Sequence, residues 1–84
     1  MVIGAQVSLY PLGQPDLLPG IQDVWEALEE AGLQKEPGPM STLVYGEDQA
    51  VLAALREGFE RATRRGPAVM VITMTNACPL PPKD

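Results

Sequence analysis

The chain has 84 residues, enough for one domain with a small core, so association with a further copy is expected. Six Lys and Arg residues against eleven Asp and Glu residues give a net charge of −5, which argues against nucleic-acid binding and modestly favours a cationic ligand. The single cysteine excludes an internal disulfide. Because no apolar run approaches the length of a membrane span, no membrane insertion is predicted. With no signal-peptide pattern at its start, the chain is expected in the cytoplasm.

The first predicted element is a strand over residues 2–10, because apolar side chains recur there at every second position. The apolar face consists of Ile3, Ala5, Val7 and Leu9, and the other face of Gly4, Gln6, Ser8 and Tyr10. Pro11 and Gly13 end this strand.

A helix is expected next, with Asp16 as its N-cap, Pro19 in its first turn and an end near residue 31. Gly32 is a suitable residue to terminate it. The predicted buried stripe follows helical spacing and consists of Leu17, Ile21, Val24, Leu28 and Ala31.

Two short strands are predicted at residues 33–36 and 40–45, separated by a Pro-Gly-Pro turn at residues 37–39. Gly46 is expected to break the second of them. A further helix opens at Glu47 and Asp48, whose charges suit its positive N-terminal end, and it ends at residues 66–67. Its expected buried face is Val51, Leu52, Leu55, Phe59 and Ala62, and its expected outer ion pairs are Arg56 with Glu60 and Glu57 with Arg61.

The last strand covers residues 68–75 and is apolar on both faces except for its threonines. The resulting β-α-β-β-α-β order predicts an α+β, ferredoxin-like sandwich, with an antiparallel sheet and both helices on one face. The first and third strands are expected in the middle of that sheet. Residues 1–79 form the predicted domain and residues 80–84 a short tail. The open sheet face, with Gln6, Ser8 and Tyr10, is a candidate interface or ligand site.

No catalytic constellation is visible. The chain has no histidine, its glycine spacings match no phosphate-binding loop, and one cysteine without histidine cannot form a transition-metal site. The acidic pairs fit solvated helix positions. The sequence therefore predicts no enzyme, no metal and no cofactor.

Several side chains have both a structural and a functional interpretation. Cys78 is interpreted as an incidental or structural thiol, or as a thiol lining a pocket, with a nucleophile disfavoured. Asn76 either caps a turn or offers its amide to a heterocycle, and the hydroxyls of Ser41 and Thr42 serve either the turn or a ligand.

The aromatic and basic side chains leave further alternatives. Trp25 is either a core contact or the wall of a site for a flat ligand. Tyr10 and Tyr45 close the first and third strands, and with those strands taken as parallel their rings are expected near one edge, favouring a flat cation. The cluster of Arg61, Arg64 and Arg65 either complements the helix dipole or forms an anion site.

Three motifs carry a resemblance to a known family. Residues 5–12, Ala-Gln-Val-Ser-Leu-Tyr-Pro-Leu, resemble the opening strand of the YkoF-type thiamine/hydroxymethylpyrimidine-binding domain. Residues 38–42, Gly-Pro-Met-Ser-Thr, followed by Gly-Glu at 46–47, are similar to its third strand. Residues 71–79 resemble its last strand and Asn-Ala-Cys-Pro ending. The motifs occur in the right order and cover almost the whole chain.

The resemblance implies non-catalytic binding of thiamine or its hydroxymethylpyrimidine precursor, as a carrier or sensor in thiamine supply. Some members carry the domain twice, and this sequence carries it once, which implies a homodimer or larger homo-oligomer. The alternative is an oligomeric regulatory module of the same fold with another ligand or none. The candidate ligand-binding residues are Gln6, Ser8, Tyr10, Met40, Ser41, Thr42, Thr75, Asn76 and Cys78, with Trp25, Met70 and Met74 as further wall candidates.

Overall fold

The computed structural model describes residues 1–38 and 41–77, so Met40, Cys78 and the predicted tail at 80–84 lie outside the described residues. The elements are β1 (Val2–Pro11), α1 (Leu18–Glu30), β2 (Gln34–Pro37), β3 (Thr42–Glu47), α2 (Asp48–Thr63) and β4 (Ala68–Thr75). This order confirms the predicted β-α-β-β-α-β arrangement. In the described part of the chain, no helix has the length and apolar character needed to cross a membrane.

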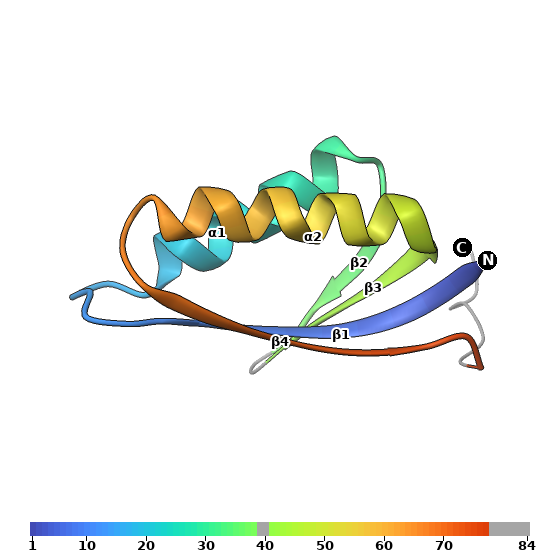
Figure 1. Cartoon of the computed structure of the whole chain (residues 1–84), viewed down its shortest axis with the longest axis horizontal. Helices are drawn as coiled ribbons and strands as arrows, with labels where there is room; N and C mark the ends of the chain where they lie inside the picture. The colour runs from blue at the N-terminus through green and yellow to red at the C-terminus, as the bar shows by residue number, and fades with distance from the viewer. Residues whose placement is uncertain (39–40, 78–84) are drawn as a thin grey trace.

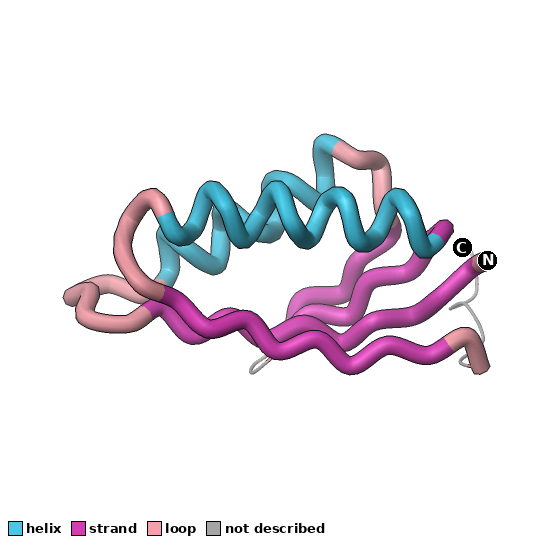
Figure 2. The backbone as a smooth tube through the Cα atoms, in the orientation of Figure 1, coloured by secondary structure: helices cyan, strands magenta, loops and turns pink. Residues whose placement is uncertain are grey.

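The four strands form one sheet in the order β2-β3-β1-β4, and every neighbouring pair is antiparallel. Both helices lie on the same side of this sheet, and no described element covers the other side (Figures 1 and 2). The predicted α+β, ferredoxin-like fold is therefore confirmed, including the central position of the first and third strands.

The core lies between the two helices and the covered side of the sheet. Strand β1 contributes its odd-numbered residues Ile3, Ala5 and Val7, each at most 4% exposed, as the alternation predicts. Val44 of β3 is fully buried beside them. The helices complete the core with Val24, Leu28, Val51, Ala54 and Leu55.

The ends of α1 differ in part from the prediction. The N-cap position falls on Leu17, one residue later than expected, although the Asp16 carboxylate still accepts a hydrogen bond from the Leu18 N–H at 3.1 Å. Pro19 has no N–H to offer, so the Leu18 N–H is the donor that the carboxylate can use. Gly32 ends the helix as predicted, with a φ of 70° and its N–H bonded to the Glu29 carbonyl.

The buried faces of both helices are shifted from the predicted stripes. Leu17 and Leu52 are 48% and 43% exposed, and Ala31 is also exposed. Each helix packs against the other helix as well as the sheet, and this second contact buries residues that periodicity alone did not select. The additional buried residues are Gly20, Asp23 and Ala27 on α1 and Ala54 and Gly58 on α2.

The prediction that Gly46 breaks the third strand is wrong. Gly46 lies within β3 and pairs with Ile3 of β1. A Cβ atom at this position would lie 2.7 Å from the Leu33 Cδ2 atom. The glycine therefore makes room for Leu33 against the core, rather than ending the strand.

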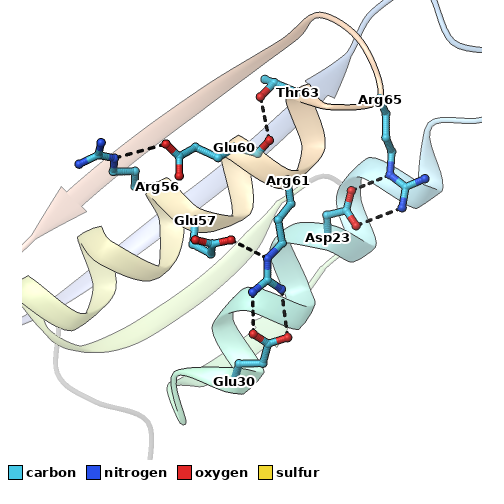
Figure 3. Close-up of polar contacts among 8 residues, drawn as sticks. All are labelled: Asp23, Glu30, Arg56, Glu57, Glu60, Arg61, Thr63 and Arg65. Atoms are coloured by element: carbon cyan, nitrogen blue, oxygen red, sulfur yellow. Dashed lines mark hydrogen bonds and ion pairs between the residues drawn. The ribbon is translucent and has the colours of Figure 1, made fainter.

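Helices α1 and α2 are joined by ion pairs along their outer side (Figure 3). Arg61 donates two hydrogen bonds to the Glu30 carboxylate, at 2.6 and 3.0 Å, and these lower the pKa of that carboxyl. It also bonds Glu57 at 2.8 Å, which confirms that predicted pair. Arg65 bonds the buried Asp23 at 2.6 and 3.2 Å. The predicted pair of Arg56 and Glu60 is present at 3.7 Å.

The helices come close together at Gly58 of α2, where a Cβ atom would lie 2.9 Å from the Val24 Cα atom. We expect Gly58→Ala to lower the free energy of unfolding by about 1–3 kcal/mol, because the added methyl group must push the helices apart. Alanine's better helix propensity, about 1 kcal/mol, offsets part of this loss. Urea denaturation measures the change.

The matched control is Ala53→Gly at an exposed site of the same helix, which measures the propensity difference alone. A stabilised Gly58→Ala variant would show that the helices are not in tight contact at this point.

Candidate functional site

The described pairing of β1 with β3 stops before β1 ends. Strand β1 has ten residues and β3 has six, and their last pair is Val7 with Thr42. Residues 8–11 continue past this point, and their described pairing is with β4. We call the region beside these residues, where residues 1–38 and 41–77 include no further pair of β1 with β3, the notch.

A pocket of about 380 Å³ occupies this notch, a volume within the range of small-molecule sites, roughly 300–1,000 Å³. Helix α1 forms one wall with Leu18, Ile21, Val24 and Trp25. The rest of the lining comes from Val7, Ser8, Leu9 and Tyr10 of β1 and from Gly38, Ser41 and Thr42 of the β2–β3 hairpin.

Trp25 is held in place by a hydrogen bond across the pocket wall. Its indole Nε1–H donates to the Thr42 hydroxyl oxygen at 2.9 Å, which ties α1 to the start of β3. Thr42 is 6% exposed, and within residues 1–38 and 41–77 its hydroxyl has no acceptor for its own proton. Since a hydroxyl can donate and accept at once, Thr42 can orient the indole and also donate to a ligand.

The described lining of the pocket contains no charged side chain. The polar residues in its lining are Ser8, Tyr10, Trp25, Ser41 and Thr42. A neutral, largely apolar pocket with an aromatic wall suits a flat heterocycle and offers no cation for a phosphate.

Of the predicted site residues, Ser8, Tyr10, Ser41 and Thr42 line this pocket. Gln6 lies next to it, on the open sheet face, and its Nε2 donates to the Ser41 hydroxyl at 3.1 Å. The structure therefore brings five of the nine candidates to one end of the sheet. Met40 and Cys78 lie outside the described residues.

Thr75 and Asn76 lie at the opposite end of the sheet. Thr75 pairs with Gly4, five residues from Leu9, which corresponds to roughly 15 Å or more along the strand. The Thr75 hydroxyl accepts a hydrogen bond from the Ala77 N–H at 2.9 Å, and the Asn76 amide contacts the Met1 sulfur at 3.6 Å. The Thr75 side chain therefore acts locally in the turn, the Asn76 side chain reaches the first residue of the chain, and the role of both toward a ligand stays a prediction.

The expectation that Tyr10 and Tyr45 share one edge is wrong. Strands β1 and β3 are antiparallel, so Tyr45 lies opposite Gly4 near the start of β1, whereas Tyr10 lies opposite Val69 near its end. The two rings are at opposite ends of the sheet, and only Tyr10 reaches the pocket.

The arginine cluster is largely used within the fold. Arg61 and Arg65 form the ion pairs between α1 and α2 described above, while Arg64 is the exposed C-cap residue of α2. Because two of the three guanidinium groups already face carboxylates, the helix-end interpretation is favoured over an anion site.

Sequence reasoning missed five apolar members of the pocket, which are Val7, Leu9, Leu18, Ile21 and Val24. All but Leu18 were assigned to buried faces by their periodicity. Leu18 falls outside the predicted stripe and is 47% exposed. The signal that could have assigned it to the pocket is an exposed leucine on the same face of the helix as Trp25.

A second hollow, of about 300 Å³, lies between α2 and β4 and is lined by Leu52, Leu55, Arg56, Phe59, Met70 and Ile72. Arg56 is its one polar member among the described residues, so this hollow has few groups that could orient a ligand.

Within residues 1–38 and 41–77, no group of three or more His, Cys, Asp or Glu side chains is placed to hold a metal ion.

Comparison with known proteins gives a family match. The model described as the YKOF-related family matches residues 2–80. No match was found among curated proteins.

Solved structures show the same fold at low sequence identity. A hypothetical protein from Methanocaldococcus jannascii superposes with a TM-score of 0.84 at 20% identity, over 92% of this chain and 81% of that one. A domain of unknown function from Bacillus cereus gives 0.79 at 17% identity, over 89% and 75%. A Thermotoga maritima protein assigned provisionally to thiamine biosynthesis or salvage gives 0.78 at 18% identity, over 88% and 82%.

The hydrogen bond between Trp25 and Thr42 can be tested by Thr42→Val, which keeps the shape and removes the hydroxyl. We expect the free energy of unfolding to fall by about 1–2 kcal/mol, because the part-buried indole N–H loses its acceptor. Trp25 is the chain's one tryptophan, so its fluorescence reports both unfolding and its own environment.

The control is Thr73→Val, at an exposed position of β4, which should change stability by less than about 0.5 kcal/mol. Equal effects of the two substitutions would contradict a specific role for the Thr42 hydroxyl.

Proposed function

Because the chain belongs to the YKOF-related family, we propose that it binds thiamine or its hydroxymethylpyrimidine precursor without altering it, as a carrier or sensor in thiamine supply. The observation that carries this proposal is the uncharged pocket beside β1, with an oriented indole and a buried hydroxyl in its wall. The fold shared with a protein provisionally assigned to thiamine biosynthesis or salvage also supports it.

The pocket matches the pyrimidine portion of this ligand class. Trp25 offers a flat surface against which an aromatic ring can stack, and Leu18 and Ile21 extend the apolar wall. The Thr42 hydroxyl can donate to a ring nitrogen. The uncharged lining favours the free alcohol or thiamine over a phosphate ester, and the net charge of −5 favours approach of the thiazolium cation.

Isothermal titration calorimetry with thiamine and, separately, with hydroxymethylpyrimidine tests the proposal. We expect saturable binding with a Kd in the micromolar range or tighter and a concurrent change in Trp25 fluorescence, since the indole forms part of the site. The Thr42→Val variant should bind roughly tenfold more weakly, because it loses one hydrogen-bond donor.

The Asn76→Ala variant serves as the comparison, because Asn76 lies at the end of the sheet opposite the pocket. Binding that is unchanged in this variant but weakened in Thr42→Val places the ligand in the notch. The reverse result would move the site to the Asn-Ala-Cys-Pro end, and no heat with either compound would remove the proposed ligand.

A homo-oligomer formed through the open sheet face is part of the same proposal. Four apolar side chains on this face are 44–49% exposed: Val2, Tyr10, Val69 and Val71. Strand β4 places Val69 and Val71 directly opposite Tyr10 and Ser8 of β1. Exposed apolar side chains close together on one sheet face, as at Tyr10, Val69 and Val71, are typical of an interface, and a second copy of the chain presents the same side chains.

Val71→Glu tests this interface at its most exposed valine. We expect the variant to sediment as a monomer where the unmodified chain forms a dimer or larger assembly, because a carboxylate at the centre of the contact would be desolvated. Analytical ultracentrifugation gives the mass of each. Ala53→Glu on the outer side of α2 is the control, and a monomeric unmodified chain would contradict the proposal.

A further inference from the structure

Thr42 and Trp25 meet at the wall of the pocket, on the helix side of the sheet. Thr42 lies opposite Val7 in the ladder of β1 and β3, and opposed residues of an antiparallel pair direct their side chains to the same face. Val7 is 3% exposed and belongs to the core beneath the helices, so the Thr42 side chain also faces the helices. Its hydroxyl oxygen lies 2.9 Å from the Trp25 Nε1 atom, and both residues line the pocket.

The indole fixes the direction of this hydrogen bond. An indole N–H can only donate, so the Thr42 oxygen must accept. A hydroxyl has one proton and two lone pairs, and Trp25 occupies one of the lone pairs. The hydroxyl proton must therefore point away from the indole. The bond between Gln6 and Ser41 has no such constraint, because a side-chain amide carries both a donor and an acceptor.

The Thr42 proton needs an acceptor that the described residues do not supply. Within residues 1–38 and 41–77, the bond from Trp25 is the one hydrogen bond of this hydroxyl. Because Thr42 is 6% exposed, water has little access to the proton. A buried donor without a partner is costly, so a ligand that brings an acceptor to this wall of the pocket binds more tightly.

We propose that Trp25 gives the ligand site a fixed hydrogen-bond polarity, in which the Thr42 hydroxyl donates to the ligand. The site then selects heterocycles that present a ring nitrogen with a free lone pair at this position. This inference rests on the proposed function and adds the selectivity of the same site. Trp25 is accordingly a positioning residue for the hydroxyl as well as an aromatic wall.

This polarity accounts for selectivity in a pocket whose described lining has no charged side chain. A ring with C–H in place of the nitrogen, or a tautomer whose nitrogen carries a hydrogen atom, fits the same volume. Either one leaves the Thr42 proton without an acceptor, which weakens binding by roughly tenfold. A site built around a buried hydrogen bond rejects the analogue that lacks the matching group.

The test is isothermal titration calorimetry of hydroxymethylpyrimidine and of its 1-deaza and 3-deaza analogues, each of which replaces one ring nitrogen by C–H. We expect the unmodified chain to bind one of the two analogues roughly tenfold more weakly than hydroxymethylpyrimidine. In Thr42→Val, this preference should shrink by the same factor, because the hydroxyl that reads the nitrogen is gone. Comparing the ratio of Kd values between chains cancels the altered basicity of the analogue.

Two further variants separate polarity from packing. Thr42→Ser keeps the hydroxyl and should keep the preference, although loss of the methyl group weakens the binding of every ligand. Trp25→Phe keeps an aromatic ring but frees the acceptor side of the hydroxyl, whose proton can then turn toward the vacated space, so the preference should fall. Circular dichroism establishes that each chain is folded, and Thr42→Ala replaces Thr42→Val if the valine variant does not fold.

The outcomes separate the two proposals. No binding of thiamine or hydroxymethylpyrimidine to the unmodified chain rejects the proposed function, and the selectivity with it. If hydroxymethylpyrimidine binds but the preference is equal in the unmodified chain and Thr42→Val, or is absent for both analogues, the polarity alone is overturned. A full preference in Trp25→Phe also overturns it, because the indole then does not set the direction of the hydroxyl.

Discussion

The packing of α1 over the second half of β1 is the constraint on which the candidate site depends. Strand β1 is paired with β4 from Gly4 to Pro11, and its described pairing with β3 runs from Val2 to Val7. At the Pro11 end of β1, α1 forms one wall of the pocket. The hydrogen bond from the Trp25 indole to the Thr42 hydroxyl ties this wall to the start of β3.

The same helix connects the site to the stability of the fold. Val24 lies against Gly58 of α2 and also lines the pocket. The bidentate pairs of Arg61 with Glu30 and of Arg65 with Asp23 fix α1 along its length. These contacts fix the position of the pocket wall within the fold. The arginines lie between the helices and are not among the residues that line the pocket.

The pocket and the open sheet face meet at Tyr10. This residue is 48% exposed, faces the open side of the sheet and is also among the residues that line the pocket. A second copy packed on that face would therefore cover one border of the notch, so that assembly and ligand binding would affect one another. This arrangement is consistent with the small core, because a domain of this size gains stability from burying a further surface.

The sequence by itself determined the local structure. The alternation in residues 2–10 predicted a strand and its faces, the apolar run in residues 68–75 predicted another strand, and the order of elements predicted the fold. It also selected Ser41 and Thr42 through a motif, and Trp25 as one of two alternatives. Only the tertiary structure decided which of these residues meet. Antiparallel register places Thr42 beside Val7 but Thr75 beside Gly4, and it separates Tyr10 from Tyr45. Packing between the helices buries Asp23, and packing of Leu33 keeps Gly46 inside β3. Periodicity reports the face on which a residue lies, whereas register and helix contacts depend on residues far apart in the chain.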